Sequence, residues 1–216
     1  MARICGVDEA GRGPVIGPLV VAGVLVEDDA HLREMRVKDS KKLSVTRREE
    51  LSEEILKTAE CDIQVVPAED IDETRKLMTI NEFEAKLFAS VLEKLRPDVA
   101  YLDSADANCR TFESLVRKEL AFDLEIICEH KADELFPVVS AASIIAKERR
   151  EEEVRRIGKE LGEDIGSGYP ADPITVEFLQ RWISEKGDLP PNTRRSWETA
   201  RRMLSESKLR KLDEYQ

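Results

Sequence analysis

The sequence predicts an α/β protein in which a mixed five-stranded sheet is flanked by helices. Two apolar runs broken by glycines, residues 3–7 and 14–26, indicate an antiparallel pair of strands. From Val99 onward, short apolar runs alternate with amphipathic stretches, which is typical of parallel strands connected by helices. Residues 171–216 carry only helical patterns, so we expect a small C-terminal helical segment.

Apolar spacing and end signals place the individual elements. In the N-terminal half we expect helices at residues 46–59 and 80–95 and a strand at residues 63–66. In the C-terminal half we expect strands at 99–102 and 124–128 and helices at 109–120, 134–160, 173–186 and 196–212. Pro137 fits the longest of these helices only in its first turn. We expect residues 1–170 to form one domain, with residues 171–216 packed on it.

Composition restricts the class of protein. The 216 residues are 41% hydrophobic, which suits one soluble globular core. No apolar run approaches the ~18 residues of a membrane span, and the N-terminus does not resemble a secretion signal, so we expect a cytoplasmic protein. Four scattered cysteines without C-x-x-C spacing disfavour a zinc or redox site. With only two histidines, carboxylates are the main candidates for chemistry.

Charge is unevenly distributed along the chain. The net charge of −11 disfavours broad nonspecific binding to nucleic acid, which depends on neutralisation of phosphates by Lys and Arg. Residues 190–216, however, contain seven Lys or Arg against four acids. A basic tail on an acidic body can still contact a polyanion locally.

Aspartates follow two of the predicted strands. Asp8 follows the first strand and Asp103 the strand at 99–102. If these strands are parallel neighbours, ~4.8 Å apart, their carboxylates can share a metal ion. Asp133 precedes the long helix, where the chain returns over the strand ends. Glu9 points to the opposite side of the sheet unless the strand ends or bulges there.

Several carboxylates in one cleft repel one another unless cations compensate them. Two Mg²⁺ ions would balance about four negative charges, and such a pair can orient a water molecule and stabilise the leaving oxygen of a phosphodiester. The residues therefore predict metal-assisted phosphate chemistry. The alternative is that Asp103 is a loop acid and Asp133 a helix N-cap.

Several motifs in fixed order carry a specific resemblance. They are G-V-D-E-A-G-R-G-P-V-I-G-P at 6–18, D-S-K-K-L at 39–43, Y-L-D at 101–103, K-A-D at 131–133, V-S-A-A-S-I-I-A-K at 139–147 and G-S-G-Y-P at 166–170. On these motifs the chain resembles ribonuclease HII, and the resemblance extends over essentially the whole chain. The segment P-N-T-R-R-S-W-E-T at 191–199 is similar to the archaeal branch.

The resemblance implies a ribonuclease H-like fold and an endoribonuclease. Such an enzyme hydrolyses the RNA strand of RNA/DNA hybrids and cuts 5′ of ribonucleotides embedded in duplex DNA, leaving 3′-OH and 5′-phosphate ends. It uses two divalent ions, Mg²⁺ or Mn²⁺. By motif, the catalytic and metal-binding acids are Asp8, Glu9, Asp103 and Asp133.

The resemblance also implies residues that contact the substrate. Gly11, Arg12 and Gly13 would read the ribose 2′-hydroxyl, and Tyr169 would stack on the adjoining deoxyribose. The alternative for Tyr169 is a ring packed under its loop. Further candidates are Lys41, Lys42, Asn81, Ser143 and Lys147. The two adjacent lysines are equally consistent with a solvated charge pair, and Asn81 with a helix cap.

Competing functions are weaker. A Rossmann nucleotide site is disfavoured because the third glycine, Gly17, comes one place late and a strand follows. Ribonuclease HIII or a resolvase is disfavoured by the Gly-Arg-Gly and Gly-Tyr-Pro motifs and by the lack of a long N-terminal extension. A noncatalytic hybrid-binding module is the main alternative, and it predicts binding that survives chelation. We expect a monomer, with a sliding-clamp contact through the C-terminal segment.

Overall fold

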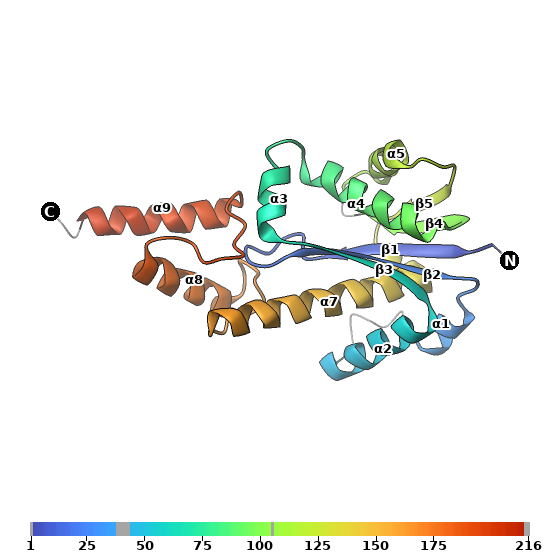
Figure 1. Cartoon of the computed structure of the whole chain (residues 1–216), viewed down its shortest axis with the longest axis horizontal. Helices are drawn as coiled ribbons and strands as arrows, with labels where there is room; N and C mark the ends of the chain where they lie inside the picture. Colours follow the sequence, from blue (N-terminus) through green and yellow to red (C-terminus); the bar gives the residue numbers. More distant parts are fainter. Residues whose placement is uncertain (1, 38–43, 105, 214–216) are drawn as a thin grey trace. The chain divides into compact units, whose positions relative to one another are not determined.

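The computed structural model describes residues 2–37, 44–104 and 106–213 (Figure 1). The chain forms two compact units, each built from separate stretches of sequence. The first unit contains Met1–Ala10, Val20–Val65 and Met78–Arg149, and the second contains Gly11–Leu19, Val66–Leu77 and Arg150–Gln216. The predicted boundary after residue 170 stays a prediction.

A five-stranded mixed sheet forms the centre of the first unit. Its order is β3-β2-β1-β4-β5. The strands are β1 (Ile4–Ala10), β2 (Leu19–Val26), β3 (Glu60–Val66), β4 (Val99–Asp103) and β5 (Glu125–Glu129). β1 pairs with β2 antiparallel, whereas β1 with β4 and β4 with β5 are parallel. The predicted sheet, antiparallel first and parallel later, is confirmed.

Helices cover both faces of this sheet (Figure 1). One face carries α4 (Ile80–Leu95) and α5 (Cys109–Glu119), and the other carries α1 (Ala30–Glu34), α2 (Val45–Thr58) and the first half of α7 (Pro137–Leu161). Side chains that alternate along the strands pack into two apolar cores. Val7 and Val21 pack with residues of α4 and α5, whereas Ala22 and Val24 pack with residues of α7. Each face of the sheet therefore has an apolar core of its own.

The approach of α7 to the sheet depends on small side chains. A Cβ atom on Gly6 of β1 would lie 2.4 Å or less from the backbone of Val138 and Val139. Ser140, Ala141 and Ser143 on the same helix are fully buried. The predicted close packing of this helix on the sheet is thus confirmed, and Gly6 is the residue on the sheet side that allows it.

Several elements differ from their predicted bounds. β1 does not end before Asp8 but continues to Ala10, because its pairing with β2 persists to that residue. The helix predicted at 134–160 is two helices, α6 (Ala132–Leu135) and α7, since Phe136 is extended, as the residue before a proline prefers. Two short helices, α1 and α3 (Ala68–Thr74), were not predicted from the sequence.

The second unit has its own apolar core. It contains α3, the second half of α7, α8 (Pro173–Lys186) and α9 (Glu198–Asp213). Val15 and Ile16 pack with residues of α7 and α8, among them Ile157 and Phe178. Backbone N–H groups of Val15 and Ile16 donate to the Gly168 carbonyl at 2.8 and 3.2 Å. Residues 11–19 are thereby tied to the chain that follows α7.

Among the residues that the structure describes, no helix is both long and apolar enough to cross a bilayer.

Candidate active site

Three aspartates of the first unit come together. Asp8 lies on β1, Asp103 ends β4 and Asp133 lies in the first turn of α6. One carboxylate oxygen from each lies within 4.8 Å of the other two, and this is the group that the described residues offer for a metal ion. The parallel pairing of β1 with β4, which sets Val7 opposite Leu102, brings the first two together. Asp8 and Asp133 are buried and Asp103 is half-buried.

A chain of hydrogen bonds supports Asp8. Its Oδ1 accepts from the Glu9 N–H at 2.7 Å, and the Ser143 side chain also hydrogen-bonds to it. Lys147 Nζ in turn donates to Ser143 Oγ at 2.7 Å. Ser143 and Lys147 thus face the same way on α7, as their spacing of one helical turn predicts. Their predicted contact with a nucleic-acid backbone stays a prediction.

Asp103 is bound by the start of α6. Its Oδ2 accepts from the Asp133 N–H at 3.4 Å, and the N–H groups of Ala132 and Lys131 also stabilise its charged form. The N-cap position of α6 is Lys131, in the left-handed region at φ 57°. The alternative that Asp133 is a helix N-cap is therefore wrong.

Burial and the charge of a neighbouring aspartate disfavour negative charge on Asp8 and Asp103. Desolvation, followed by the charge of Asp103, raises the pKa of Asp8 to about 7. Desolvation and the charge of Asp133 raise the pKa of Asp103 as well. A compact set of buried carboxylate oxygens whose charge is uncompensated suits a hard divalent cation such as Mg²⁺ or Mn²⁺. The residues present fit a metal centre.

Glu9 is not a member of this group of aspartates. It pairs regularly with Val21, so β1 neither ends nor bulges at this position, and its side chain leaves the strand on the face opposite Asp8. It is half-buried. Its role as a metal ligand stays a prediction.

In the second unit, residues 11–13 form a turn that only glycine permits at its first position. Gly11 has φ +90°, and a Cβ there would lie 2.5 Å from the Pro18 carbonyl oxygen and 2.7 Å from Arg150 Cδ. Gly11 is buried and Gly13 is exposed. We call residues 11–13 the Gly-Arg-Gly turn.

Tyr169 lies beside this turn. Its side chain is 39% exposed, and a Cβ built on Gly13 would lie 3.5 Å from its Cε1. The Arg150 guanidinium lies 4.8 Å from the ring centroid, while its Nη2 donates to the Ser167 carbonyl at 2.7 Å. Tyr169 is therefore held from one side by a cation and presents part of its ring to solvent.

The remaining residues that the sequence suggested as substrate contacts are Asn81, Lys41 and Lys42. Asn81 hydrogen-bonds through its side chain to Asp106, and the cap of α4 is Thr79, which forms a capping box with Glu82. Asn81 is thus not the cap of its helix. Lys41 and Lys42 lie outside the described residues.

Comparison with known proteins settles the family. The family model for ribonuclease HII matches residues 5–200. The chain belongs to the ribonuclease HII family. It is 43% identical to the ribonuclease HII of Methanocella arvoryzae over 208 residues, 95% of this chain and 93% of the relative. The predicted family is confirmed, and so is the enzyme class.

Solved structures of ribonuclease HII proteins agree with the fold. The crystal structure of the ribonuclease H2 from Pyrococcus horikoshii OT3 superimposes with a TM-score of 0.89 at 42% identity, covering 95% of this chain and 99% of that one. The ribonuclease HII in a PCNA complex from Archaeoglobus fulgidus gives 0.83 at 45% identity, covering 92% and 96%. The predicted ribonuclease H-like sheet is confirmed.

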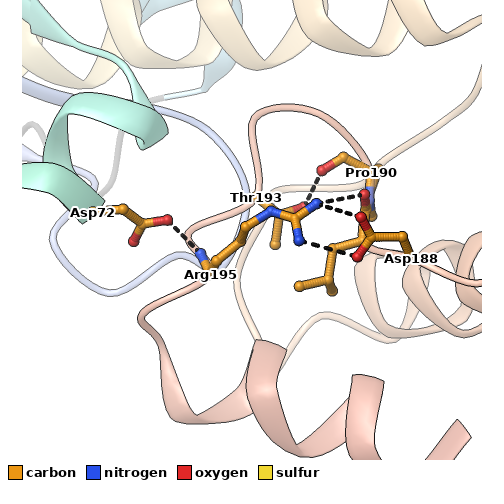
Figure 2. Close-up of polar contacts among 6 residues, drawn as sticks. Asp72, Asp188, Pro190, Thr193 and Arg195 are labelled. Atoms are coloured by element: carbon orange, nitrogen blue, oxygen red, sulfur yellow. Dashed lines mark hydrogen bonds and ion pairs between the residues drawn. The ribbon is translucent and has the colours of Figure 1, made fainter. Parts of the chain in front are cut away.

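Three polar side chains of the second unit were not identified from the sequence. Arg150 contacts Tyr169, Arg194 contacts the Gly-Arg-Gly turn, and Asp72 accepts from the N–H groups of Arg195 and Ser196 at 2.6 and 3.0 Å. Figure 2 shows Arg195 between Asp72 and Asp188. Nothing local distinguishes Arg194 from Arg195 in the sequence. Only the fold buries the Arg194 side chain and leaves that of Arg195 exposed.

Proposed function

We propose that this chain is an endoribonuclease that cuts the RNA strand of RNA/DNA hybrids and cuts 5′ of single ribonucleotides embedded in duplex DNA. The observation that carries the proposal is the group formed by Asp8, Asp103 and Asp133, with oxygens within 4.8 Å of one another, in a member of the ribonuclease HII family. The products would carry 3′-OH and 5′-phosphate ends.

The acids would act by binding divalent cations. Asp8, Asp103 and Asp133 would hold the Mg²⁺ or Mn²⁺ ions, two in the active complex. Bound ions of this kind supply an activated water molecule and stabilise the leaving oxygen of a phosphodiester. The chain itself orients the ligands: Ser143 and the Glu9 N–H hold Asp8, and the first turn of α6 holds Asp103.

The second unit would select the sugar. Backbone groups of the Gly-Arg-Gly turn can approach a ribose closely because Gly11 and Gly13 carry no side chain. The 2′-hydroxyl is the group that distinguishes RNA from DNA at one nucleotide. Tyr169, with part of its ring exposed, would stack on the neighbouring deoxyribose.

Cleavage of a DNA duplex that contains one ribonucleotide tests the proposal. With Mg²⁺ we expect a single cut 5′ of the ribonucleotide, and with EDTA we expect none. A DNA polymerase should extend the new 3′ end directly. An all-DNA duplex of the same sequence is the control. Binding that survives EDTA without any cleavage in Mg²⁺ would instead identify a noncatalytic hybrid-binding module.

We also propose a sliding-clamp contact through the C-terminal segment. The support is the Archaeoglobus fulgidus relative, whose structure is that of a complex with PCNA. Size-exclusion chromatography of the protein with a clamp, with and without residues 208–216, tests it. Loss of co-elution on truncation is expected, and unchanged co-elution would contradict it. The same column gives the mass of the protein alone, for which we expect a monomer.

A further inference from the structure

Arg194 is the largest side chain with no exposed surface among the described residues. Burial of a guanidinium is costly unless several acceptors surround it. Three of its nitrogens donate to carbonyl oxygens of residues 11–17: Nη2 to Gly11 at 2.5 Å, Nη1 to Arg12 at 2.9 Å and Nε to Gly17 at 3.0 Å. One side chain from the end of the sequence thus holds a turn near its beginning.

These bonds fix the direction in which the turn presents its N–H groups. In a trans peptide the N–H points opposite to the C=O of the same unit. Since the Gly11 and Arg12 carbonyls face the guanidinium, the Arg12 and Gly13 N–H groups point away from it. Gly13 is exposed, so this second direction leads toward solvent. Two successive N–H groups with the same outward direction form a concave donor site for oxygen ligands.

The guanidinium also strengthens these donors. A carbonyl that accepts from a cation is polarised, which makes the N–H of the same peptide a better donor. A lysine could not reproduce the arrangement, because its single ammonium nitrogen cannot reach three carbonyls in the planar geometry of a guanidinium.

Arg194 is itself firmly placed. Its N–H donates to the Val15 carbonyl at 2.8 Å, and its guanidinium lies 4.9 Å from the centroid of Trp197, whose ring also faces Arg75 at 5.0 Å. The residues that follow are fixed by Asp72. The segment is therefore a rigid support and not a loop that adapts to the turn.

We propose that Arg194 is a positioning residue for recognition of the ribose 2′-hydroxyl. It would do so by locking the Gly-Arg-Gly turn with the Arg12 and Gly13 N–H groups directed outward. The inference rests on the proposed function, because that function requires the protein to distinguish a ribonucleotide from a deoxyribonucleotide. Arg194 would be one structural reason that it can do so.

Arg194→Lys and Arg194→Gln test the proposal, with Arg195→Lys and Arg195→Gln as matched controls. Arg195 is the next residue, and its side chain binds Asp188 and the Leu189 carbonyl rather than the turn (Figure 2). Two duplexes are compared that differ only at one nucleotide, which is either ribo or 2′-fluoro. Binding is measured in EDTA, and kcat and KM for the ribo duplex are measured in Mg²⁺.

We expect both Arg194 variants to bind the ribo and 2′-fluoro duplexes with nearly equal affinity, where the unmodified protein prefers ribo. Their kcat/KM on the ribo duplex should fall at least ~10-fold, a loss of about 1.4 kcal/mol of transition-state stabilisation. Affinity for an all-DNA duplex should change less than ~2-fold. The Arg195 variants should keep both the preference and the rate.

Three results would overturn the inference. The first is an unchanged ribo preference in folded Arg194 variants, measured well below their melting midpoints. The second is failure of both variants to fold while the Arg195 variants fold, which would assign Arg194 to stability alone. The third is an equal loss in the Arg195 variants. If the unmodified protein itself neither cuts nor prefers the ribo duplex, the proposed function fails rather than the role of Arg194.

Discussion

The group of three aspartates and the Gly-Arg-Gly turn are held in opposite ways. The aspartates bring like charges together in a buried place, where desolvation and repulsion raise the pKa of Asp8 and Asp103. The turn is held by a buried cation whose three nitrogens each donate to a carbonyl oxygen. The first arrangement is incomplete until cations bind, whereas the second is complete within the protein. The aspartates are thus arranged to bind a cation, whereas the Gly-Arg-Gly turn is arranged to stay rigid.

Removal of one acid should have the largest effect. Asp8→Asn or Asp133→Asn should lower the cleavage rate by roughly 10³-fold or more, because a lost ligand removes several kcal/mol of metal-derived transition-state stabilisation. Binding of the ribo duplex should remain largely intact. Single-turnover cleavage and a binding titration in EDTA measure the two quantities. Asp123→Asn, an exposed aspartate, is the control. Turnover near the unmodified rate in either variant would contradict the role of the acids.

Loss of the Tyr169 ring should be the next largest effect. Tyr169→Ala should reduce cleavage at a single embedded ribonucleotide by roughly 10-fold, the equivalent of one stacking contact of about 1–2 kcal/mol. Its melting midpoint should change little, because the side chain is 39% exposed. Tyr169→Phe, which keeps the ring, should retain most of the activity. A larger loss of stability than of activity would favour a packing role instead.

The pH dependence of stability should differ with and without metal. A carboxyl whose folded pKa is raised stabilises the fold below its unfolded pKa and loses that contribution as pH rises. For Asp8 the interval runs from about 4 to about 7. In EDTA the melting midpoint should therefore fall between pH 5 and pH 8, by about 2–4 °C for each kcal/mol.

Mg²⁺ should raise the melting midpoint, and the increase should be larger at pH 8 than at pH 5, because protons compete with the cation for the same oxygens. Thermal unfolding at both pH values, with Mg²⁺ and with EDTA, measures the effect. In the Asp8→Asn variant, the decrease of the melting midpoint with rising pH should be smaller. A midpoint that responds to neither pH nor Mg²⁺ would show that the acids do not repel one another in the folded protein.

The smallest effect is expected at Asp72. Its carboxylate accepts from the N–H groups of Arg195 and Ser196 and from Ser196 Oγ. Asp72→Ala should lower the free energy of unfolding by about 1–3 kcal/mol, because it leaves these donors without an acceptor. Metal-dependent stabilisation should not change, since no member of the metal group is altered. Glu73→Gln is the control on the same helix, and an equal loss there would contradict the role of Asp72.

The sequence by itself determined the elements and the family. Apolar spacing placed α4 and α8 at the observed residues, and apolar runs of four to thirteen residues predicted the strands and the mixed sheet, although β2 begins only at Leu19. The motifs around Asp8, Asp103 and Asp133 predicted the family and pointed to one metal site. These patterns are local in the sequence, so they can be recognised without knowledge of the tertiary packing.

Tertiary structure decided how each side chain is used. Asp133 is not a helix cap because Lys131 in the left-handed region takes that position, and Glu9 leaves β1 on the opposite face because pairing with β2 continues past Asp8. Arg194 and Arg195 are adjacent and chemically identical, yet the buried Arg194 holds the Gly-Arg-Gly turn and the exposed Arg195 pairs with Asp188. Burial and long-range hydrogen bonds depend on partners far along the chain, which local pattern does not encode.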